Sequence, residues 1–454
     1  MKKASNILLV LLTAILLTNC KESDTSAVLE IDPPVLLHSI PQNNAVNVPV
    51  GDISVRLEFD KIVFCPSAGH SKVSINDTGI SSISVQSKEI IINIVGLQAE
   101  KTYTLTIPKG VILGPNQVET NEIKISFTTA AALEIAKNPV TENPSPEAVA
   151  LYNYLRGSYG NKIIAGTVAQ VAWNTVEAER VERWTGKFPK INVFDYIHLW
   201  ASPTNWIDYG DISVIENWHN AGGIVGAMWH WNVPKSETAA GGDVTFRPEE
   251  TTFRPANALV SGTWENTVML ADLGKMADYL LLLKNKNIPV LWRPLHEAAG
   301  NMYATGYKGA AWFWWGRDGA EAFKSLWIYM FNYFESKGLN NLIWIWTTEV
   351  TDSPFYPGNG YVDIVGRDLY NNASATATAA QFKQIQDLYP TKMITLAECG
   401  NVANIGEQWN AGARWAWFMP WYDYNAADSD ILPHEHAGKQ WWLNAVNQQF
   451  VVTR

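Results

Sequence analysis

The sequence predicts an α/β protein in which a (β/α)8 TIM barrel follows a small all-β sandwich domain. Three observations support this fold class. The last roughly 310 residues alternate buried-strand patterns with helical patterns, as βα units do. The region before them alternates apolar and polar residues in short runs, as half-buried strands do. All 21 Trp lie between Trp173 and Trp442, so the two regions differ sharply in composition.

Residues 32–130 are expected to form the sandwich. Runs such as 53–59 and 123–127 alternate apolar and polar side chains, and Gly, Pro and Asn mark the turns between them. Residues 39–50, SIPQNNAVNVPV, resemble the opening of bacterial Ig-like modules. We expect this domain to act as a spacer. Glycan binding is the alternative, but the domain is poor in the aromatic rings that stack on sugars.

The barrel is expected over residues 147–454, after a linker at 131–146 that contains the turn-forming stretch Asn143-Pro-Ser-Pro146. Near-continuous apolar runs, typical of parallel strands covered on both faces, give eight strand candidates. These are 162–167, 191–196, 224–229, 290–295, 342–346, 364–369, 393–397 and 414–419. Residues 265–286 show the apolar stripe of a helix. An open doubly wound sheet is the alternative, but no Gly-rich phosphate turn follows the first strand.

The N-terminus has the pattern of an exported lipoprotein. Residues 1–19 combine two Lys with a short apolar run, as a signal peptide does, and the run is too short to span a bilayer. Cys20 stands where a bacterial lipoprotein box, which this segment resembles, would be cleaved and lipidated. Residues 20–31 then form a tether, whose Lys-Glu-Ser-Asp start resembles the export tags of Bacteroidetes surface lipoproteins. We expect an outer-membrane lipoprotein exposed at the cell surface. A periplasm-facing anchor and an ordinary secretory signal are the alternatives.

Charge and cysteine content exclude several classes of partner. The formal net charge of −10 argues against nucleic acid, because phosphate binding needs clustered Lys and Arg. Only Cys65 and Cys399 follow Cys20, which gives neither a disulfide framework nor a thiolate metal site. We expect no cofactor, no metal and a monomeric protein. The abundance of Trp favours a carbohydrate ligand, because flat aromatic rings stack on the C–H faces of sugars.

Two glutamates are the candidate catalytic pair. Glu297 follows the fourth predicted strand and Glu398 follows the seventh, so both are expected at the barrel mouth, where TIM barrels carry their catalytic residues. Retaining glycoside hydrolysis needs two carboxyl groups ~5–5.5 Å apart, one as nucleophile and one as acid/base. The acid/base must stay protonated, so its surroundings should raise its pKa. A structural salt bridge is the alternative for either glutamate alone.

Other catalytic motifs do not fit. His296-Glu297 is not part of a zinc-binding His-Glu-x-x-His, because position 300 is Gly. No Gly-x-Ser-x-Gly nucleophile elbow occurs in the chain. The segment His434-Glu435-His436 lacks a third metal ligand, and we expect it to be a loop after the last strand.

From about Asn138 to the end, the sequence resembles glycoside hydrolase family 26. The resemblance rests on three motifs: Arg293-Pro-Leu-His-Glu297-Ala-Ala-Gly300, Trp312-Phe-Trp-Trp-Gly316 and Leu396-Ala-Glu398-Cys-Gly400. Most members of the family are β-mannanases. The resemblance implies that Glu297 is the acid/base and Glu398 the nucleophile. The intervening residues 302–311 depart from the family pattern, and a loop of that size should shape the leaving-group subsites.

The resemblance also implies a set of substrate-binding residues, each carried over by its local motif. They are His230, Arg293, His296, Trp312, Asp368, Tyr370 and Trp421. His296 would bind the sugar 2-hydroxyl, and Arg293 would orient the nucleophile and lower its pKa. Asp368 would bind sugar hydroxyls and Tyr370 would hydrogen-bond the nucleophile. Trp421 would form the floor under the cleaved sugar, and Trp312 would lie near the leaving-group side. For Arg293 a structural ion pair is the alternative, and for His230 and both Trp it is packing at the barrel rim.

The sequence therefore predicts a retaining endo-β-1,4-mannanase that acts on mannan, glucomannan or galactomannan. Within the same family resemblance, the alternatives are a mixed-linkage β-glucanase, a xylanase or a mannobiose-releasing exo-enzyme. Outside it, the alternative is a non-catalytic glycan-binding lipoprotein, against which the presence of both glutamates argues.

Overall fold

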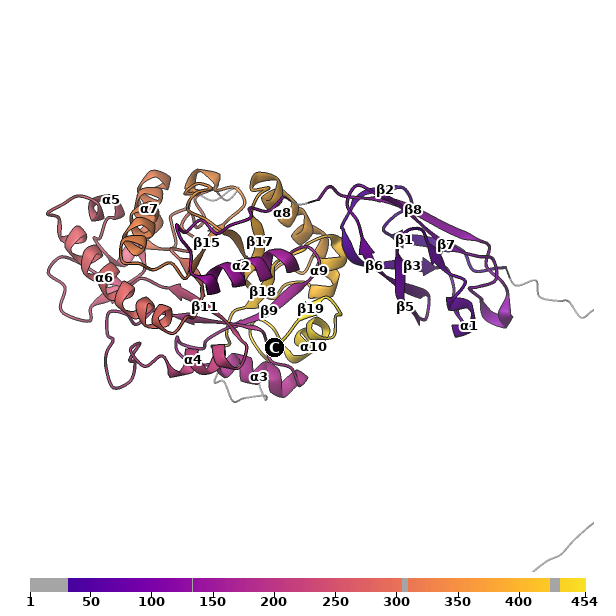
Figure 1. The fold of residues 1–454 in the computed structure, drawn as a ribbon, viewed down its shortest axis with the longest axis horizontal. Coiled ribbons are helices and arrows are strands. Elements are labelled where there is room, and N and C mark those ends of the chain that lie inside the picture. Colours follow the sequence, from indigo (N-terminus) through magenta and orange to yellow (C-terminus); the bar gives the residue numbers. More distant parts are fainter. Residues whose placement is uncertain (1–31, 133, 304–308, 425–432) are drawn as a thin grey trace, which may run out of the picture.

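A computed structural model describes residues 32–132, 134–303, 309–424 and 433–454. The first range is a β-sandwich of two four-stranded sheets, as predicted (Figure 1). One sheet has the order β1 (Leu36–Ile40), β3 (Gly51–Phe59), β6 (Glu89–Leu97), β5 (Gly79–Gln86). The other has the order β2 (Ala45–Val48), β8 (Ile123–Thr129), β7 (Thr102–Ile107), β4 (Ser74–Ile75). The alternating apolar side chains of these strands, among them Val55, Leu57 and Ile92, are fully buried between the sheets. A short helix, α1 (Ser67–His70), and a 3-10 turn, η1 (Pro115–Gln117), complete the domain.

The second part is a closed barrel of eight parallel strands, as predicted. Around the ring they are β9 (Ile163–Val168), β10 (Ile191–Asp195), β11 (Ile224–Trp229), β14 (Val290–Pro294), β15 (Leu342–Thr348), β16 (Ile364–Tyr370), β17 (Met393–Gly400) and β18 (Trp417–Pro420). The barrel closes because β9 pairs with both β10 and β18. A short strand, β19 (Val451–Val452), also runs beside β9.

Helices lie outside the ring, where they cover the apolar outer faces of the strands (Figure 1). They are α2 (Pro146–Ser158), α3 (Val176–Thr185), α4 (Ser213–Asn220), α5 (Pro255–Ala258), α6 (Trp264–Asn285), α7 (Ala320–Ser336), α8 (Ala375–Leu388), α9 (Ile405–Ala411) and α10 (Lys439–Val446). The longest, α6, matches the predicted 265–286 helix within one residue at each end. It begins there because the Thr263 side chain caps it, accepting a bond from the backbone N–H of Asn266 at 3.1 Å. The connections also carry 3-10 turns η2 (Pro248–Glu250), η3 (Trp314–Gly316) and η4 (Ser353–Phe355), and a small hairpin of β12 (Val233–Pro234) and β13 (Val244–Thr245).

The eighth strand begins at Trp417, three residues later than predicted. Arg414, where the strand was expected to begin, contacts the sandwich domain. Its guanidinium lies 3.8 Å from the centre of the Trp409 ring and donates a 3.2 Å hydrogen bond to the backbone oxygen of Asp52 in the sandwich. Lys162 adds a second contact to the Asp52 carboxylate, at 3.8 Å. The sandwich therefore contacts the barrel on the side that carries α9 (Figure 1). Lys162 and Arg414 precede β9 and β18, so this contact is near the N-terminal ends of the strands.

The predicted linker is partly packed on the barrel. The backbone N–H of Val140 donates to the Asp363 carboxylate at 2.7 Å, and the backbone N–H of Ser145 donates to the Asn340 oxygen at 2.8 Å. Asn340 and Asp363 lie just before β15 and β16, so these hydrogen bonds fix the segment at the N-terminal end of the barrel. Within the described ranges, no helix combines the length and the apolar character needed to cross a bilayer.

Most of the tryptophans pack the barrel and do not face a ligand. Eleven of their side chains are less than 2% exposed: Trp229, Trp231, Trp292, Trp314, Trp315, Trp327, Trp344, Trp346, Trp409, Trp415 and Trp442. The high Trp content is therefore mainly a property of the core, and only a few rings remain for stacking on a sugar.

Candidate active site

The candidate acid/base lies in a strained turn directly after β14. Leu295 and Glu297 both have φ of +49°, in the left-handed region that non-glycine residues rarely adopt. The turn is closed by a 3.0 Å hydrogen bond from the backbone N–H of Gly300 to the Glu297 oxygen. Strained backbone of this kind persists where the surrounding structure enforces it, and it is common at functional sites. Here it leaves the Glu297 side chain half-buried at the barrel mouth.

The carboxylate of Glu398 is held by two partners from other strands. Arg293 Nη1 on β14 donates to Glu398 Oε2 at 3.0 Å, and the Tyr370 hydroxyl at the end of β16 donates to Oε1 at 2.6 Å. The structure thus contains the predicted hydrogen bond between Tyr370 and Glu398, the candidate nucleophile. Burial and the negative charge of Glu398 raise the pKa of Tyr370 well above its usual value, so the phenol keeps its proton and remains a donor.

Arg293 joins this carboxylate to Asp368. The guanidinium is buried, donates to the Asp368 carboxylate, and sends its Nε to the Thr347 hydroxyl at 3.1 Å. Arg293 therefore forms buried ion pairs with both Asp368 and Glu398. Its predicted action on the nucleophile stays a prediction. The Asp368 side chain is fully buried at this pair, although its Oδ1 has no partner among the described residues. Its binding of sugar hydroxyls stays a prediction.

The surroundings of Glu297 favour its protonated form. Burial is the main cause that raises its pKa well above the usual value, and the negative charges of Asp368, Glu398 and Glu349 act in the same direction. Arg293 acts against them with a smaller effect. The surroundings of Glu297 thus suit a proton donor, while Glu398 accepts hydrogen bonds from Arg293 and Tyr370.

Two histidines, His230 and His296, lie against each other at the barrel mouth. His230 follows β11, and its Nδ1 is 2.5 Å from the carboxylate of Asp195, the last residue of β10. The ring centre of His296 is 4.6 Å from that of His230 and 4.9 Å from that of Phe313. Burial, with smaller effects from Arg293 and His230, lowers the pKa of His296 well below its usual value. A neutral imidazole with one N–H can donate to a sugar hydroxyl, and Nδ1 of His296 has no partner among the described residues.

Trp421 follows β18 and lies close to His230. Its backbone N–H donates to the Cys399 oxygen at 2.8 Å, and its ring centre is 5.9 Å from that of His230. The indole N–H donates to the Tyr424 hydroxyl at 2.9 Å. Because both its backbone N–H and its indole N–H are hydrogen-bonded, the Trp421 ring is held in place and is suited to be the predicted floor under a sugar. Packing at the rim remains the alternative.

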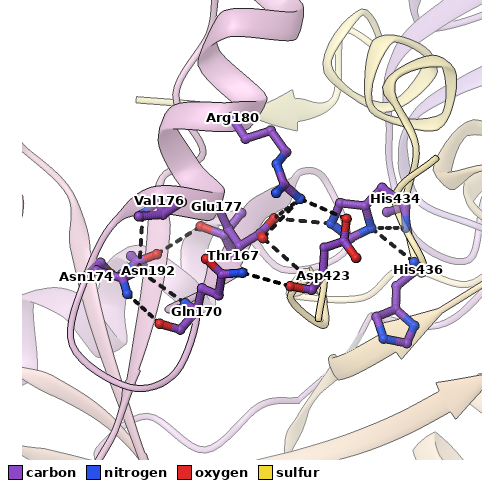
Figure 2. A network of polar contacts seen from close by, with 11 residues as sticks. Thr167, Gln170, Asn174, Val176, Glu177, Arg180, Asn192, Asp423, His434 and His436 are labelled. Atoms are coloured by element: carbon purple, nitrogen blue, oxygen red, sulfur yellow. Dashed lines mark hydrogen bonds and ion pairs between the residues drawn. The ribbon is translucent and has the colours of Figure 1, made fainter. Parts of the chain in front are cut away.

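A buried ionic network holds the loop that carries Trp421. Figure 2 shows Glu177 and Arg180 of α3 meeting Asp423 and His434. Arg180 lies 3.2 Å from the Glu177 carboxylate and 3.3 Å from that of Asp423, and the Gln170 amide donates to the Asp423 backbone oxygen at 3.0 Å. Because these groups are buried and paired, they fix the loop after β18 against α3.

His434 fixes the tight turn that follows. Its Nδ1 accepts bonds from the backbone N–H groups of His436 and Ala437, each at 3.0 Å. The proton of the neutral ring is then on Nε2, which faces Glu177 Oε2 at 3.1 Å (Figure 2). The segment His434-Glu435-His436 is a loop, as predicted. In the described part of the chain, no three His, Cys, Asp or Glu side chains are grouped as a metal site would require.

Trp312 has an exposed ring, as contact with a leaving group would require. Its side chain is 40% exposed and no described ring lies against it. Phe313 and Trp315, which stack on each other at 4.4 Å, are the aromatic rings that pack on His296. The neighbouring insertion at 302–311 lies partly outside the described residues, at 304–308. A leaving-group contact for Trp312 stays a prediction.

Sequence patterns missed three residues of this site. Asp195 orients His230, Phe313 packs on His296, and Glu349 adds a further carboxylate after β15. Asp195 lies near the end of the predicted strand 191–196, which was a signal that could have found it. Glu349 lies three residues beyond the predicted strand 342–346 and directly follows β15 only because this strand extends to Thr348 in the structure. Phe313 gave no such signal, because neighbouring aromatic residues in one motif look alike until their side chains are placed.

Comparison with known proteins agrees with this geometry. Residues 140–445 match the model for glycosyl hydrolase family 26, and residues 30–129 match that for a bacterial Ig-like domain. A mannan endo-1,4-β-mannosidase A from Piromyces sp is 29% identical, over 83% of this chain and 62% of the relative. A mannan endo-1,4-β-mannosidase from Thermothelomyces thermophilus is 37% identical, over 63% of this chain and 58% of the relative. The chain thus spans roughly three-fifths of the length of these two relatives.

Solved structures give the same family. The family 26 domain of an endo-β-mannanase/endo-β-glucanase from Prevotella bryantii is 41% identical with a TM-score of 0.66, covering 70% of this chain and 98% of that one. A β-mannanase from a symbiotic protist of the termite Reticulitermes speratus, complexed with gluco-manno-oligosaccharide, is 30% identical with a TM-score of 0.59, covering 71% and 98%. From residue 140 onward, this chain is a member of glycoside hydrolase family 26.

Proposed function

We propose that the protein is a retaining endo-β-1,4-mannanase that acts on mannan, glucomannan or galactomannan as a monomer. The observation that carries the proposal is the pairing of Glu297, whose surroundings favour the protonated acid, with Glu398, which is hydrogen-bonded by Arg293 and Tyr370. Relatives named mannan endo-1,4-β-mannosidase support the substrate.

In the proposed reaction, Glu398 attacks the anomeric carbon while Glu297 gives its proton to the leaving oxygen. The C–O bond to the leaving sugar breaks as the bond to Glu398 forms. Glu297, now a carboxylate, takes a proton from water, whose oxygen attacks the same carbon and releases Glu398. Arg293 and Tyr370 keep the nucleophile aimed at the sugar. His296 and Trp421 would contact the cleaved sugar from the two sides.

A substrate panel tests the specificity. With equal enzyme on mannan, lichenan and xylan, reducing-sugar release should be fastest on mannan, and the early products should include a range of oligosaccharides, as internal cuts give. NMR of the first product should show retained β configuration. Faster release from lichenan or xylan would favour those related activities, release of mannobiose alone would indicate an exo mode, and an inverted product would contradict the mechanism. Binding to mannan without hydrolysis would favour the glycan-binding alternative.

We also propose that Cys20 carries a lipid that anchors the protein to the outer membrane, facing the cell surface. The sequence pattern around Cys20 supports this proposal. Wild type should fractionate with membranes and be accessible to protease on intact cells, whereas Cys20→Ser should lose its lipid and leave the membrane fraction. Membrane-bound protein that resists external protease would indicate the periplasmic face. Sedimentation of the Cys20→Ser protein measures whether it is a monomer.

A further inference from the structure

Four acidic residues stand at the C-terminal ends of four adjacent strands. Glu297 follows β14, Glu349 follows β15, Asp368 lies near the end of β16, and Glu398 lies on β17. The register brings the strand ends that carry them close to one level. Trp292 pairs with Trp344, five residues before Glu297 and Glu349, while Thr348 pairs with Arg367 and Asp368 pairs with Glu398. Three of the four have a place in the proposed reaction or in the ion pair beneath it. Glu349 takes part in neither.

The side chain of Glu349 is fixed but only half satisfied. Arg367 Nη1 donates to Oε2 at 2.8 Å, and Arg367 is itself held by a 3.0 Å bond from its Nε to the Gln381 side chain. The side chains of Glu349 and Arg367 are only 15% and 12% exposed. The other oxygen, Oε1, is buried without a partner among the described residues. A purely structural ion pair in the interior is expected to satisfy both carboxylate oxygens, whereas this one leaves Oε1 of Glu349 without a hydrogen bond.

The charged groups around Glu297 come from each neighbouring strand. Asp368 and Glu398 both contact Arg293, so their charges are partly balanced close to Glu297. The negative charge of Glu349 is paired with Arg367, on the next strand. The negative charges of Asp352 and Glu398 also act on Glu349 and raise its pKa. Burial is the main cause that raises the pKa of Glu349, to about 7. Glu349 therefore becomes negatively charged as the pH rises through the neutral range. An acid/base begins to lose its proton in the same range.

We propose that Glu349 is a positioning residue for the acid/base, whose negative charge holds the proton on Glu297 as the pH rises. The proposal rests on the proposed role of Glu297. The sign follows from charge repulsion: once Glu349 has ionised, a second negative charge beside it is disfavoured, so Glu297 stays protonated to higher pH. Glu349 needs no contact with the sugar for this effect, which agrees with the burial of its oxygens.

The test is the pH dependence of kcat/KM on a mannan in Glu349→Gln. Loss of the charge should move the basic limb of the profile to lower pH by about one unit, the size expected for one charge at several Å in a partly buried site. Glu349→Asp keeps the charge and should keep the basic limb near its wild-type position. If Glu349→Gln fails to fold, as judged by its melting curve, Glu349→Ala carries the same expectation.

Two controls separate this role from a structural one. Asp363→Asn removes a buried carboxyl, also with a raised pKa, at the opposite end of the adjacent strand, and should leave the basic limb in place. An aryl mannoside with a strongly acidic leaving group needs no proton from Glu297, so its basic limb should not respond to Glu349→Gln. A structural defect would act on both substrates.

A basic limb on mannan that is the same in Glu349→Gln as in wild type would overturn the inference. So would an equal shift on both substrates, or an equal shift in Asp363→Asn. If Glu297→Ala itself hydrolysed mannan at the wild-type rate, the proposed acid/base would be wrong, which is a separate result from the failure of the Glu349 proposal.

Discussion

Glu398→Ala should lose at least about 10⁴-fold in kcat on mannan, because without its carboxylate no covalent intermediate can form. The loss should be similar on an aryl mannoside, since a good leaving group does not replace a nucleophile. Both rates are measured by initial-velocity kinetics with protein checked for a wild-type melting curve. Glu407→Ala, which removes an exposed carboxylate on α9 of the same βα unit, should retain the wild-type rate.

Azide gives this variant a diagnostic product. The space left by the Glu398 side chain lies on the face from which the nucleophile attacks, so azide entering it should form a mannosyl azide of inverted configuration. NMR of the product identifies the anomer. An azide product of retained configuration would place the nucleophile at a residue other than Glu398.

Glu297→Ala should show a loss that depends on the leaving group. On mannan, whose leaving oxygen must be protonated, we expect kcat/KM to fall about 10³-fold. On a dinitrophenyl mannoside, whose leaving group departs without a proton, the first step should fall less than about tenfold. Stopped-flow release of dinitrophenol measures that step directly.

The second step then becomes slow in Glu297→Ala, because no base activates water. Azide needs no such base, so it should accelerate turnover and give a mannosyl azide of retained configuration. The opposite azide products of the two variants distinguish acid/base from nucleophile. An equal loss on both substrates, without azide rescue, would assign Glu297 a structural role.

Local patterns in the sequence were sufficient to predict the barrel and its sandwich. Buried parallel strands appear as continuous apolar runs, and all eight predicted runs form strands of the ring. Two boundaries were displaced by three residues: the seventh strand ends at Gly400 instead of 397, and the eighth begins at Trp417 instead of 414. Arg414 contacts Asp52 in the other domain. Contacts between residues so far apart along the chain have no local signal.

The high Trp content is a second feature that the sequence alone does not explain. A count of tryptophans does not distinguish rings that face a sugar from rings that fill the core. In the structure, eleven are less than 2% exposed, whereas Trp312 is 40% exposed. Adjacent aromatic residues in the motif from Trp312 to Gly316 point in different directions, and only packing decides that Phe313 and Trp315 lie against His296.

From the sequence alone, Glu297 and Glu398 are expected just after strands four and seven, at the mouth of one barrel. The structure places Glu297 after β14 but Glu398 within β17, two residues before its end, because this strand is longer than predicted. The tertiary structure decided what surrounds them. Arg293 and Tyr370 reach Glu398 because closing the ring brings β14, β16 and β17 together. The proton on Glu297 depends on burial and on charges from neighbouring strands, Glu349 among them. Strand order follows from local hydrophobic patterns, whereas protonation depends on the distances between side chains, and these exist only after the barrel has closed.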